Sequence, residues 1–268
     1  MPTAVRLDAV DVTFATPGRA AYQAVSGADL TVAEGEFVAI VGPTGSGKST
    51  LLNAAAGLLR PSAGRVEIGG VALSGLNRKA GYLFQADALM PWKTSRDNVA
   101  IGLEIAGTPR REALSRAEEW LTRVGLTGFG DRYPHMLSGG QRKRVAMAQV
   151  LIRDPQILLM DEPFGPLDAQ TRLIMGDLLL GLWQQDRNAV MFVTHDLEEA
   201  ISLADRVVIM STGPAAKIIG DFPIPLQRPR DVSEIKLTPE FQRLHRDIWA
   251  LLKEQVLKAY ANTVGTSA

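Results

Sequence analysis

The stretch Gly42-Pro-Thr-Gly-Ser-Gly-Lys48-Ser49-Thr50 most constrains what this chain can fold into. The apolar run 37–41 before it indicates a buried parallel strand, and the residues from Leu51 to about Leu59 indicate a helix. A glycine-rich loop between a strand and a helix is the setting in which such loops bind phosphate. Glycines let backbone N–H groups converge on one anion, and the helix start adds its positive dipole end.

Two side chains of this loop carry chemistry that follows from their residue type. Lys48 can reach the outer phosphates of a nucleotide, and the Ser49 hydroxyl can ligate the Mg²⁺ that accompanies them. The alternative is a glycine-rich turn with an unrelated lysine, and the correctly placed strand and helix argue against it. The sequence therefore predicts a nucleoside triphosphate site.

Length and composition limit the remaining possibilities. The 268 residues suffice for one large domain, or for one domain with a subdomain. The 29 basic and 29 acidic residues cancel, so no global field indicates nucleic acid or an anionic membrane as a partner. The lack of cysteine excludes disulfides and thiolate metal sites and suits the cytosol. Neither a signal peptide nor an apolar run of roughly twenty residues is present, so we expect no membrane crossing.

Apolar runs and turn residues predict an α/β chain with a helical insertion. Residues 87–154 are largely helical, and 81–85 is a short strand that ends in a glutamine. Residues 223–229 form a proline-rich connector, and Thr238-Pro239 starts a helix. Further strands are expected at 5–13, 27–32, 36–41, 156–160, 189–194, 206–210 and 217–222.

Polar residues end two of these strands. Asp161-Glu162 follows the apolar run 156–160, and carboxylates at the end of a buried strand are costly unless they meet a cation or do chemistry. With a phosphate loop upstream, Asp161 can complete a magnesium shell. His195 stands at the end of strand 189–194, where ligands of open sheets gather, although a lone histidine is more often structural.

Two further features allow alternatives. Leu137-Ser-Gly-Gly-Gln141 places Ser138 at an N-cap and leaves N–H groups uncovered, which fits either a plain helix cap or an anion site. Phe14 either stacks on a nucleotide base or belongs to the core, and the sequence does not favour one of them.

The order of these motifs resembles an ABC-transporter nucleotide-binding subunit, from residue 5 to about 222. The resemblance implies an α/β fold with a P-loop NTPase core, an antiparallel β subdomain and an α-helical insertion. It implies an ABC ATPase domain at 1–222, with its helical subdomain at about 87–154. The remaining residues, 223–268, are expected from the connector and helix signals to form a C-terminal helical extension. The motifs are the phosphate loop 42–50, Gln85, Leu137–Gln141, 157–162, Leu167-Asp168 and His195.

The resemblance also implies a role for each matching residue. Glu162 would polarise the attacking water, and His195 and Gln85 would complete the catalytic set. Magnesium would be held by Ser49, Gln85 and Asp161. The residues that would contact ATP are Phe14, Gly42, Pro43, Thr44, Gly45, Ser46, Gly47, Lys48, Ser49, Thr50, Ser138, Gly139, Gly140, Gln141 and Asp168.

Partners follow from the same resemblance. A second ATP-binding subunit, expected to be an identical copy, would have its ATP covered by Ser138-Gly139-Gly140 of this chain. Two transmembrane permease subunits, and through them a solute-binding protein, would place the chain at the cytoplasmic face of the inner membrane; no nucleic acid is expected. Leu89, Met90 and Trp92 are the expected docking residues. Alternatively, Trp92 packs under the helical insertion.

Shorter segments narrow the resemblance to the nitrate/sulfonate/taurine importers. They include Phe84-Gln85, Pro91-Trp92, 194–200 and Gln227–Arg230. A soluble ABC ATPase without a transport role is the alternative, but such proteins typically carry a coiled-coil insertion or two cassettes. A P-loop kinase would leave 137–141 unexplained. The chain departs from the family pattern at Lys143, Gln149 and Pro166.

Overall fold

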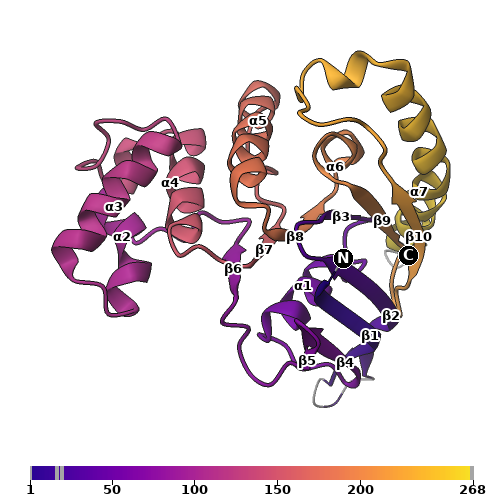
Figure 1. Ribbon diagram of the computed structural model, residues 1–268. Helices are drawn as coiled ribbons and strands as arrows, with labels where there is room; N and C mark the ends of the chain where they lie inside the picture. The colour runs from indigo at the N-terminus through magenta and orange to yellow at the C-terminus, as the bar shows by residue number, and fades with distance from the viewer. Residues whose placement is uncertain (1, 16–17, 19–20, 266–268) are drawn as a thin grey trace.

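The computed structural model describes residues 2–15, 18 and 21–265, of which 262–265 are described by their backbone alone. Within these ranges a six-stranded sheet has the order β10-β9-β3-β8-β7-β6 (Figure 1). The strands from β9 to β6 run parallel, so their carboxyl ends share one edge, and β10 pairs antiparallel with β9. The bounds are Phe37–Val41 (β3), Ala80–Leu83 (β6), Ile157–Asp161 (β7), Ala189–Thr194 (β8), Arg206–Met210 (β9) and Ile218–Pro223 (β10).

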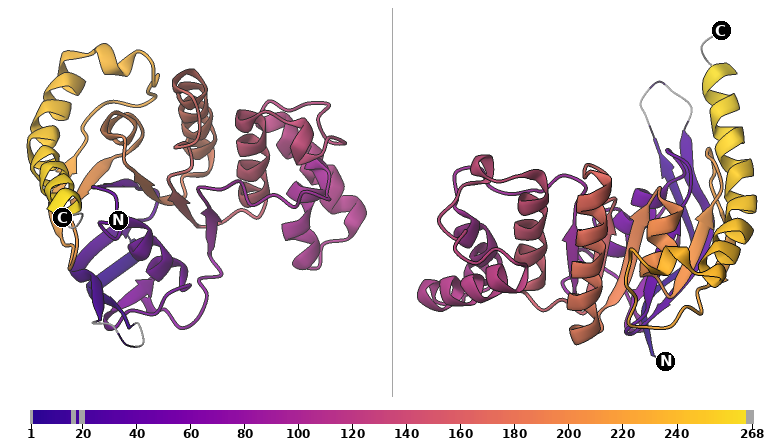
Figure 2. Two further views of the ribbon diagram at one scale, coloured as in Figure 1. Left: turned by 180° about the vertical axis from the view of Figure 1, so that it is seen from behind. Right: turned by 90° about the horizontal axis from the view of Figure 1, so that it is seen from above.

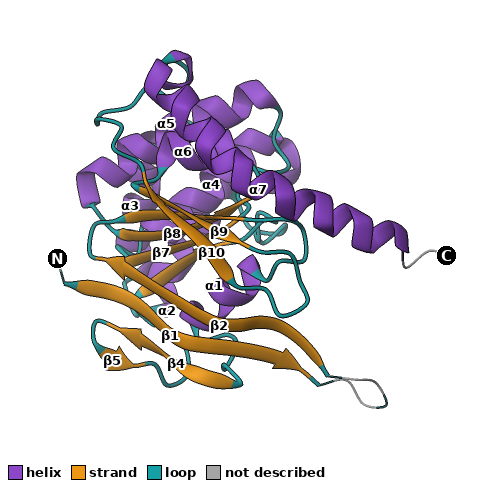
Figure 3. Cartoon of the chain, turned by 90° about the vertical axis from the view of Figure 1, so that its right-hand side faces the viewer, coloured by secondary structure: helices purple, strands orange, loops and turns teal. Residues whose placement is uncertain are grey.

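An antiparallel sheet, in the order β2-β1-β4-β5, lies beside the first one (Figure 3). Helix α1 (Lys48–Ala56) contacts strands of both sheets, and its buried Leu51 and Leu52 belong to the apolar cluster between them. The sequence predicts this helix to about Leu59, but it ends at Ala56 and is capped by Gly57, whose φ of 71° is readily adopted by glycine alone. The strands are Thr3–Phe14 (β1), Tyr22–Ala33 (β2), Ala63–Ile68 (β4) and Val71–Ala72 (β5).

The helices between β6 and β7 form a separate lobe at one side of the sheets (Figures 1 and 2). Ala113, Ala117 and Leu121 are fully buried there, because their three-four spacing puts them on one face of their helix. The elements are α2 (Ser95–Ile105), α3 (Arg110–Arg123), the 3₁₀ turn η1 (Pro134–Met136) and α4 (Gly139–Leu151). We call this part, α2 to α4, the helical lobe.

Helices α5 (Ala169–Asp186), α6 (Leu197–Leu203) and α7 (Pro239–Gly265) cover the other face of the central sheet (Figure 1). The chain reaches α7 through a short 3₁₀ turn, η2 (Ile235–Leu237).

The C-terminal segment is fastened to the sheet at several points. Phe241, Ile248 and Leu252 of α7 are buried in the same cluster as the sheet. Before this helix, the buried Arg230 donates hydrogen bonds to carbonyl oxygens at the end of α6 and in the connector. Cationic donors at a helix carboxyl end satisfy its last carbonyl groups. No helix within the described ranges has the length and apolar character that a membrane span requires.

Candidate functional site

The phosphate loop runs from the carboxyl end of β3 to the first residue of α1. Gly47, immediately before α1, has a φ of 79°, and a Cβ there would lie 2.6 Å from Val25 Cγ2. Glycine is therefore required for both conformation and space. No side chain of the described residues caps the start of α1, which leaves backbone N–H groups for an anion.

Lys48 is held inside this loop. Its side chain is 5% exposed, and Nζ donates hydrogen bonds to the carbonyl oxygens of Gly42 (2.9 Å) and Pro43 (3.0 Å). Nζ also lies 4.0 Å from Oε1 of Glu162. Burial lowers the pKa of Lys48, and the carboxylates of Glu162 and Asp161 oppose that shift. The loop thus keeps a cation beside the phosphate-binding N–H groups.

Ser49 and Asp161 form the polar pair that could hold a magnesium ion. The Ser49 Oγ donates a hydrogen bond to Asp161 Oδ1 over 2.7 Å. Burial, with a contribution from Glu162, raises the pKa of Asp161, and a bound cation would relieve that cost. Mg²⁺ prefers oxygen ligands and takes one or two carboxylates together with phosphate oxygens, so this hydroxyl–carboxylate pair fits it.

Tyr82 of β6 lies beside the Ser49–Asp161 pair, a position that no sequence pattern predicts. Its hydroxyl donates to Asn53 Oδ1 at 3.0 Å and lies 3.5 Å from Asp161 Oδ2. The pKa of Tyr82 is raised mainly by burial and further by the nearby negative charge of Asp161. No local motif indicates this role, because it depends on β6 lying beside β7 in the sheet.

Glu162 and His195 meet above the ends of β7 and β8. His195 Nδ1 lies 3.1 Å from Glu162 Oε2, and the Glu162 N–H donates to the Val193 carbonyl oxygen over 2.9 Å. Glu162 has a φ of 42°, a conformation that costs a side-chain-bearing residue energy and is concentrated at functional sites. The backbone turn aims the carboxylate back toward Lys48.

Gln85 and Phe14 do not join this cluster by a contact. β6 ends at Leu83 rather than at the glutamine, so Gln85 lies in the following loop with an exposed side chain. No hydrogen bond among the described residues joins that side chain to Ser49 or Asp161. Phe14 is 42% exposed at the end of β1, opposite the exposed Tyr22. Their roles stay predictions.

The segment 138–141 starts α4 in the helical lobe, away from α1 of the same chain (Figures 1 and 2). Ser138 Oγ accepts from the Gln141 N–H over 3.3 Å, and the Gln141 side chain accepts from the Ser138 N–H over 2.9 Å. These two reciprocal bonds form a capping box, so the Gln141 side-chain oxygen is already bonded to the start of its own helix. Gly139 and Gly140 form the first turn of the helix.

Asp168 has a structural task in this conformation. Its carboxylate caps α5 by accepting from the Thr171 N–H (2.9 Å) and hydroxyl (2.6 Å). The hydrogen bond from the Thr171 hydroxyl is the largest cause that lowers the pKa of Asp168, and hydrogen bonds from backbone N–H groups lower it further. A contact with ATP stays a prediction.

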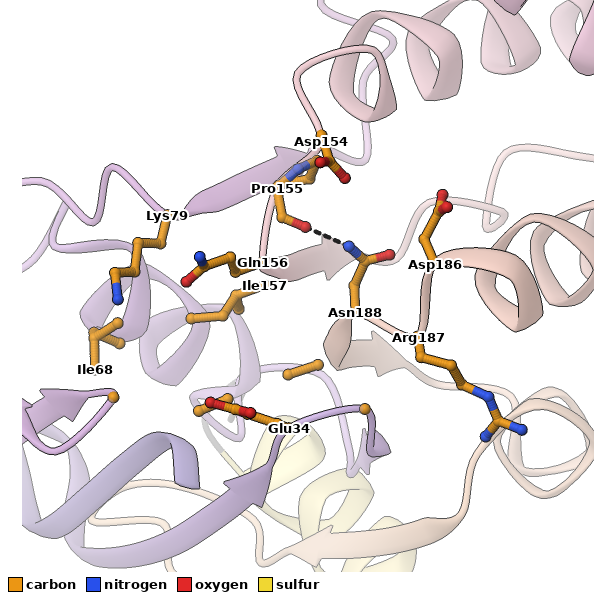
Figure 4. A pocket seen from close by; sticks show the side chains of 14 residues that line it. Glu34, Ile68, Lys79, Asp154, Pro155, Gln156, Ile157, Asp186, Arg187 and Asn188 are labelled. Atoms are coloured by element: carbon orange, nitrogen blue, oxygen red, sulfur yellow. Dashed lines mark hydrogen bonds between the residues drawn. The ribbon is translucent and has the colours of Figure 1, made fainter. Parts of the chain in front are cut away.

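A pocket of about 400 Å³ lies at the opposite edge of the central sheet, by the amino ends of β7 and β8 (Figure 4). Charged side chains of both signs surround it, among them Glu34, Lys79 and Asp186. Asn188 donates to the Pro155 carbonyl oxygen beside it. It shares no residue with the cluster around Lys48 and Glu162.

Comparisons with known proteins agree on one family. The sequence model of the ABC transporter family matches residues 25–165. The taurine import ATP-binding protein of Rhizobium johnstonii is 42% identical over 251 residues, covering 92% of this chain and 96% of that protein. The Pseudomonas aeruginosa protein of the same name is 45% identical over 229 residues, covering 84% and 86%.

A solved structure supports the fold. The dimeric, post-hydrolysis state of an ATP-binding cassette bound to ADP and phosphate superimposes with a TM-score of 0.73 at 32% identity. The match covers 83% of this chain and all of the cassette.

Proposed function

Because this chain belongs to the ABC transporter family and is an ATPase, we propose that it powers an importer for taurine or a related small solute such as another sulfonate or nitrate. The observation that carries the proposal is the convergence of Lys48, Ser49, Asp161, Glu162 and His195 at one edge of the sheet. The names of the two taurine import relatives support the transport role and its solute class.

The phosphate loop would bind the ATP phosphates through its N–H groups and Lys48. The lysine would exchange its bonds to the Gly42 and Pro43 carbonyl oxygens for phosphate oxygens. Ser49 and Asp161, with Gln85 from the loop after β6, would hold Mg²⁺, which neutralises charge that develops on the phosphates. Phe14 would stack on the base.

Glu162 would accept a hydrogen bond from the attacking water and orient it toward the γ-phosphate. Lys48, 4.0 Å from Oε1, and His195, 3.1 Å from Oε2, fix the direction of this carboxylate. His195 would contact the γ-phosphate from the end of β8. Positioning and charge stabilisation supply most of the catalysis in phosphoryl transfer.

A second copy would complete the site. The start of α4 presents Ser138, Gly139 and Gly140 away from the phosphate loop of the same chain, and a helix start favours an anion. Head-to-tail pairing would place these residues over the ATP of the other copy. Two permease subunits would dock on the helical lobe and on Trp92, which is 74% exposed, whereas Leu89 packs partly against the core. Such docking would put the protein at the cytoplasmic face of the inner membrane.

The test is ATP-driven uptake. The chain is reconstituted in vesicles with the permease subunits and the solute-binding protein of a taurine importer, and uptake of radiolabelled taurine is measured with nitrate and other sulfonates as competitors. We expect uptake that needs ATP and disappears in Glu162→Gln. Robust ATP hydrolysis with no uptake of any of these solutes would contradict the proposed solute class.

A further inference from the structure

Lys143 is a buried lysine in the second turn of α4, only 1% exposed. Its Nζ donates hydrogen bonds to the carbonyl oxygens of Gln85 (2.9 Å) and Phe84 (3.3 Å) and lies 3.0 Å from Asp87 Oδ1. An ammonium group has three donors, and burying it is costly unless they are paired. All of these acceptors belong to one short stretch, the loop after β6.

A second residue of α4, Arg142, also binds the Asp87 carboxylate. Arg142 Nε donates to Asp87 Oδ2 over 3.2 Å, and the Arg142 guanidinium also donates to the Leu137 carbonyl oxygen over 2.8 Å. The loop is thereby fixed to α4 by charge-assisted bonds, which are the stronger kind. We call Asp87, Arg142 and Lys143 the loop clamp.

The loop clamp holds the backbone of Gln85 directly. The Gln85 side chain is exposed and makes no hydrogen bond among the described residues, so the backbone on which it stands determines where it can reach. Lys143 contacts that backbone directly.

We propose that Lys143 is a positioning residue for Gln85. By fixing the loop backbone, it places the Gln85 side chain where it can join Ser49 and Asp161 at the metal. This rests on the proposed role of Gln85 as a magnesium ligand. Lys143 has no hydrogen bond to the phosphate loop among the described residues, so binding of metal-free nucleotide depends on other groups.

The experiment measures binding, not turnover. Calorimetry gives the Kd of the non-hydrolysable β,γ-imido analogue of ATP with Mg²⁺ and with a chelator, for the parent, Lys143→Met and Asp87→Asn. The Kd measured in chelator divided by the Kd measured in Mg²⁺ reports how much the metal strengthens nucleotide binding. Substituting a group that supports a metal ligand typically lowers metal affinity by about tenfold or more. We therefore expect the ratio to fall about tenfold in Lys143→Met. Asp87→Asn should change it in the same direction, and the metal-free Kd should stay unchanged.

Val145→Ala is the matched control, because Val145 is fully buried on the same helix and its apolar side chain has no hydrogen-bonding group with which to hold the loop. It should lower stability but keep the parent's Kd ratio. Lys143→Met is then repeated in a Gln85→Ala background, where it should add nothing. If Gln85→Ala lowers the Kd ratio but Lys143→Met leaves it unchanged, the positioning role of Lys143 is overturned and the metal role of Gln85 stands. An unchanged ratio in Gln85→Ala overturns the metal role of Gln85 and the inference with it.

Discussion

The Nδ1 atom of His195 lies 3.1 Å from Oε2 of Glu162, so the ends of β8 and β7 meet at one carboxylate. The other oxygen of that carboxylate is 4.0 Å from Nζ of Lys48. Three separate parts of the sequence therefore converge on one carboxylate. This arrangement supports the view that Glu162 orients the water that attacks ATP.

Lys48→Ala should weaken ATP binding itself. The loop loses its buried cation, and a charge-assisted hydrogen bond to phosphate contributes about 2–3 kcal/mol, which predicts a rise in the ATP Kd of roughly 30- to 150-fold. Calorimetric titration with ATP and Mg²⁺ checks this. An ATP Kd within threefold of the parent would show that Lys48 does not reach the phosphates.

Ser49→Ala should raise the Mg²⁺ concentration that gives half-maximal ATPase activity. The substitution removes a hydroxyl that pairs with Asp161 and would ligate the ion, and we expect an increase of about tenfold. Ser49→Thr is the matched control, because it keeps the hydroxyl and should stay close to the parent. Equal shifts in both variants would argue for a packing effect instead.

Glu199 should make stability depend on pH. Its side chain is buried and accepts a hydrogen bond from the Thr194 hydroxyl. Burial raises its pKa to about 7 from an ordinary value of 4.5. The folded state then holds its proton more tightly than the unfolded state. The free energy of unfolding therefore falls as pH rises from below the ordinary pKa through the raised one.

Glu199→Gln removes that titration. Relative to the parent, the variant should gain up to about 3 kcal/mol in unfolding free energy between about pH 4.5 and pH 8. Urea unfolding at several pH values measures the difference. If the free energy of unfolding changed with pH in the same way in parent and variant, Glu199 would have the same pKa in the folded and unfolded protein.

The C-terminal segment should contribute to stability. Phe241 is 1% exposed and packs in the same cluster as the central sheet, so Phe241→Ala should cost about 3–5 kcal/mol. Leu257→Ala, at an exposed position of the same helix, is the control and should cost little. Urea unfolding compares the two, and equal small losses would mean that α7 docks only loosely.

Short-range patterns predicted the α/β fold and most element positions. The phosphate loop stands between a strand and a helix as expected, and strands 189–194 and 206–210 have the expected bounds. Their signals lie within a few neighbouring residues: an all-apolar run for a strand, glycines for the loop. Because carboxyl ends of parallel strands share an edge, the same logic anticipated that Asp161 and His195 would lie near Lys48.

Contacts between distant segments were not predictable in this way. The clamp from Lys143 to Asp87 joins residues that have no common local pattern, and Tyr82 meets Asp161 only through strand order. The capping box at the start of α4 was predictable only in part. The sequence placed Ser138 at the N-cap, but it did not predict that the Gln141 side chain accepts a hydrogen bond from the Ser138 N–H. Such features depend on packing rather than on propensity.

The central claim is that two copies of this chain share their ATP sites. Light scattering of Glu162→Gln, with and without ATP and Mg²⁺, tests it most directly. The variant should bind ATP without appreciable hydrolysis, so we predict a monomer that becomes a dimer only when ATP is added. Lys48→Ala in the same background should stay monomeric. A Glu162→Gln protein that binds ATP and remains a monomer would contradict the account.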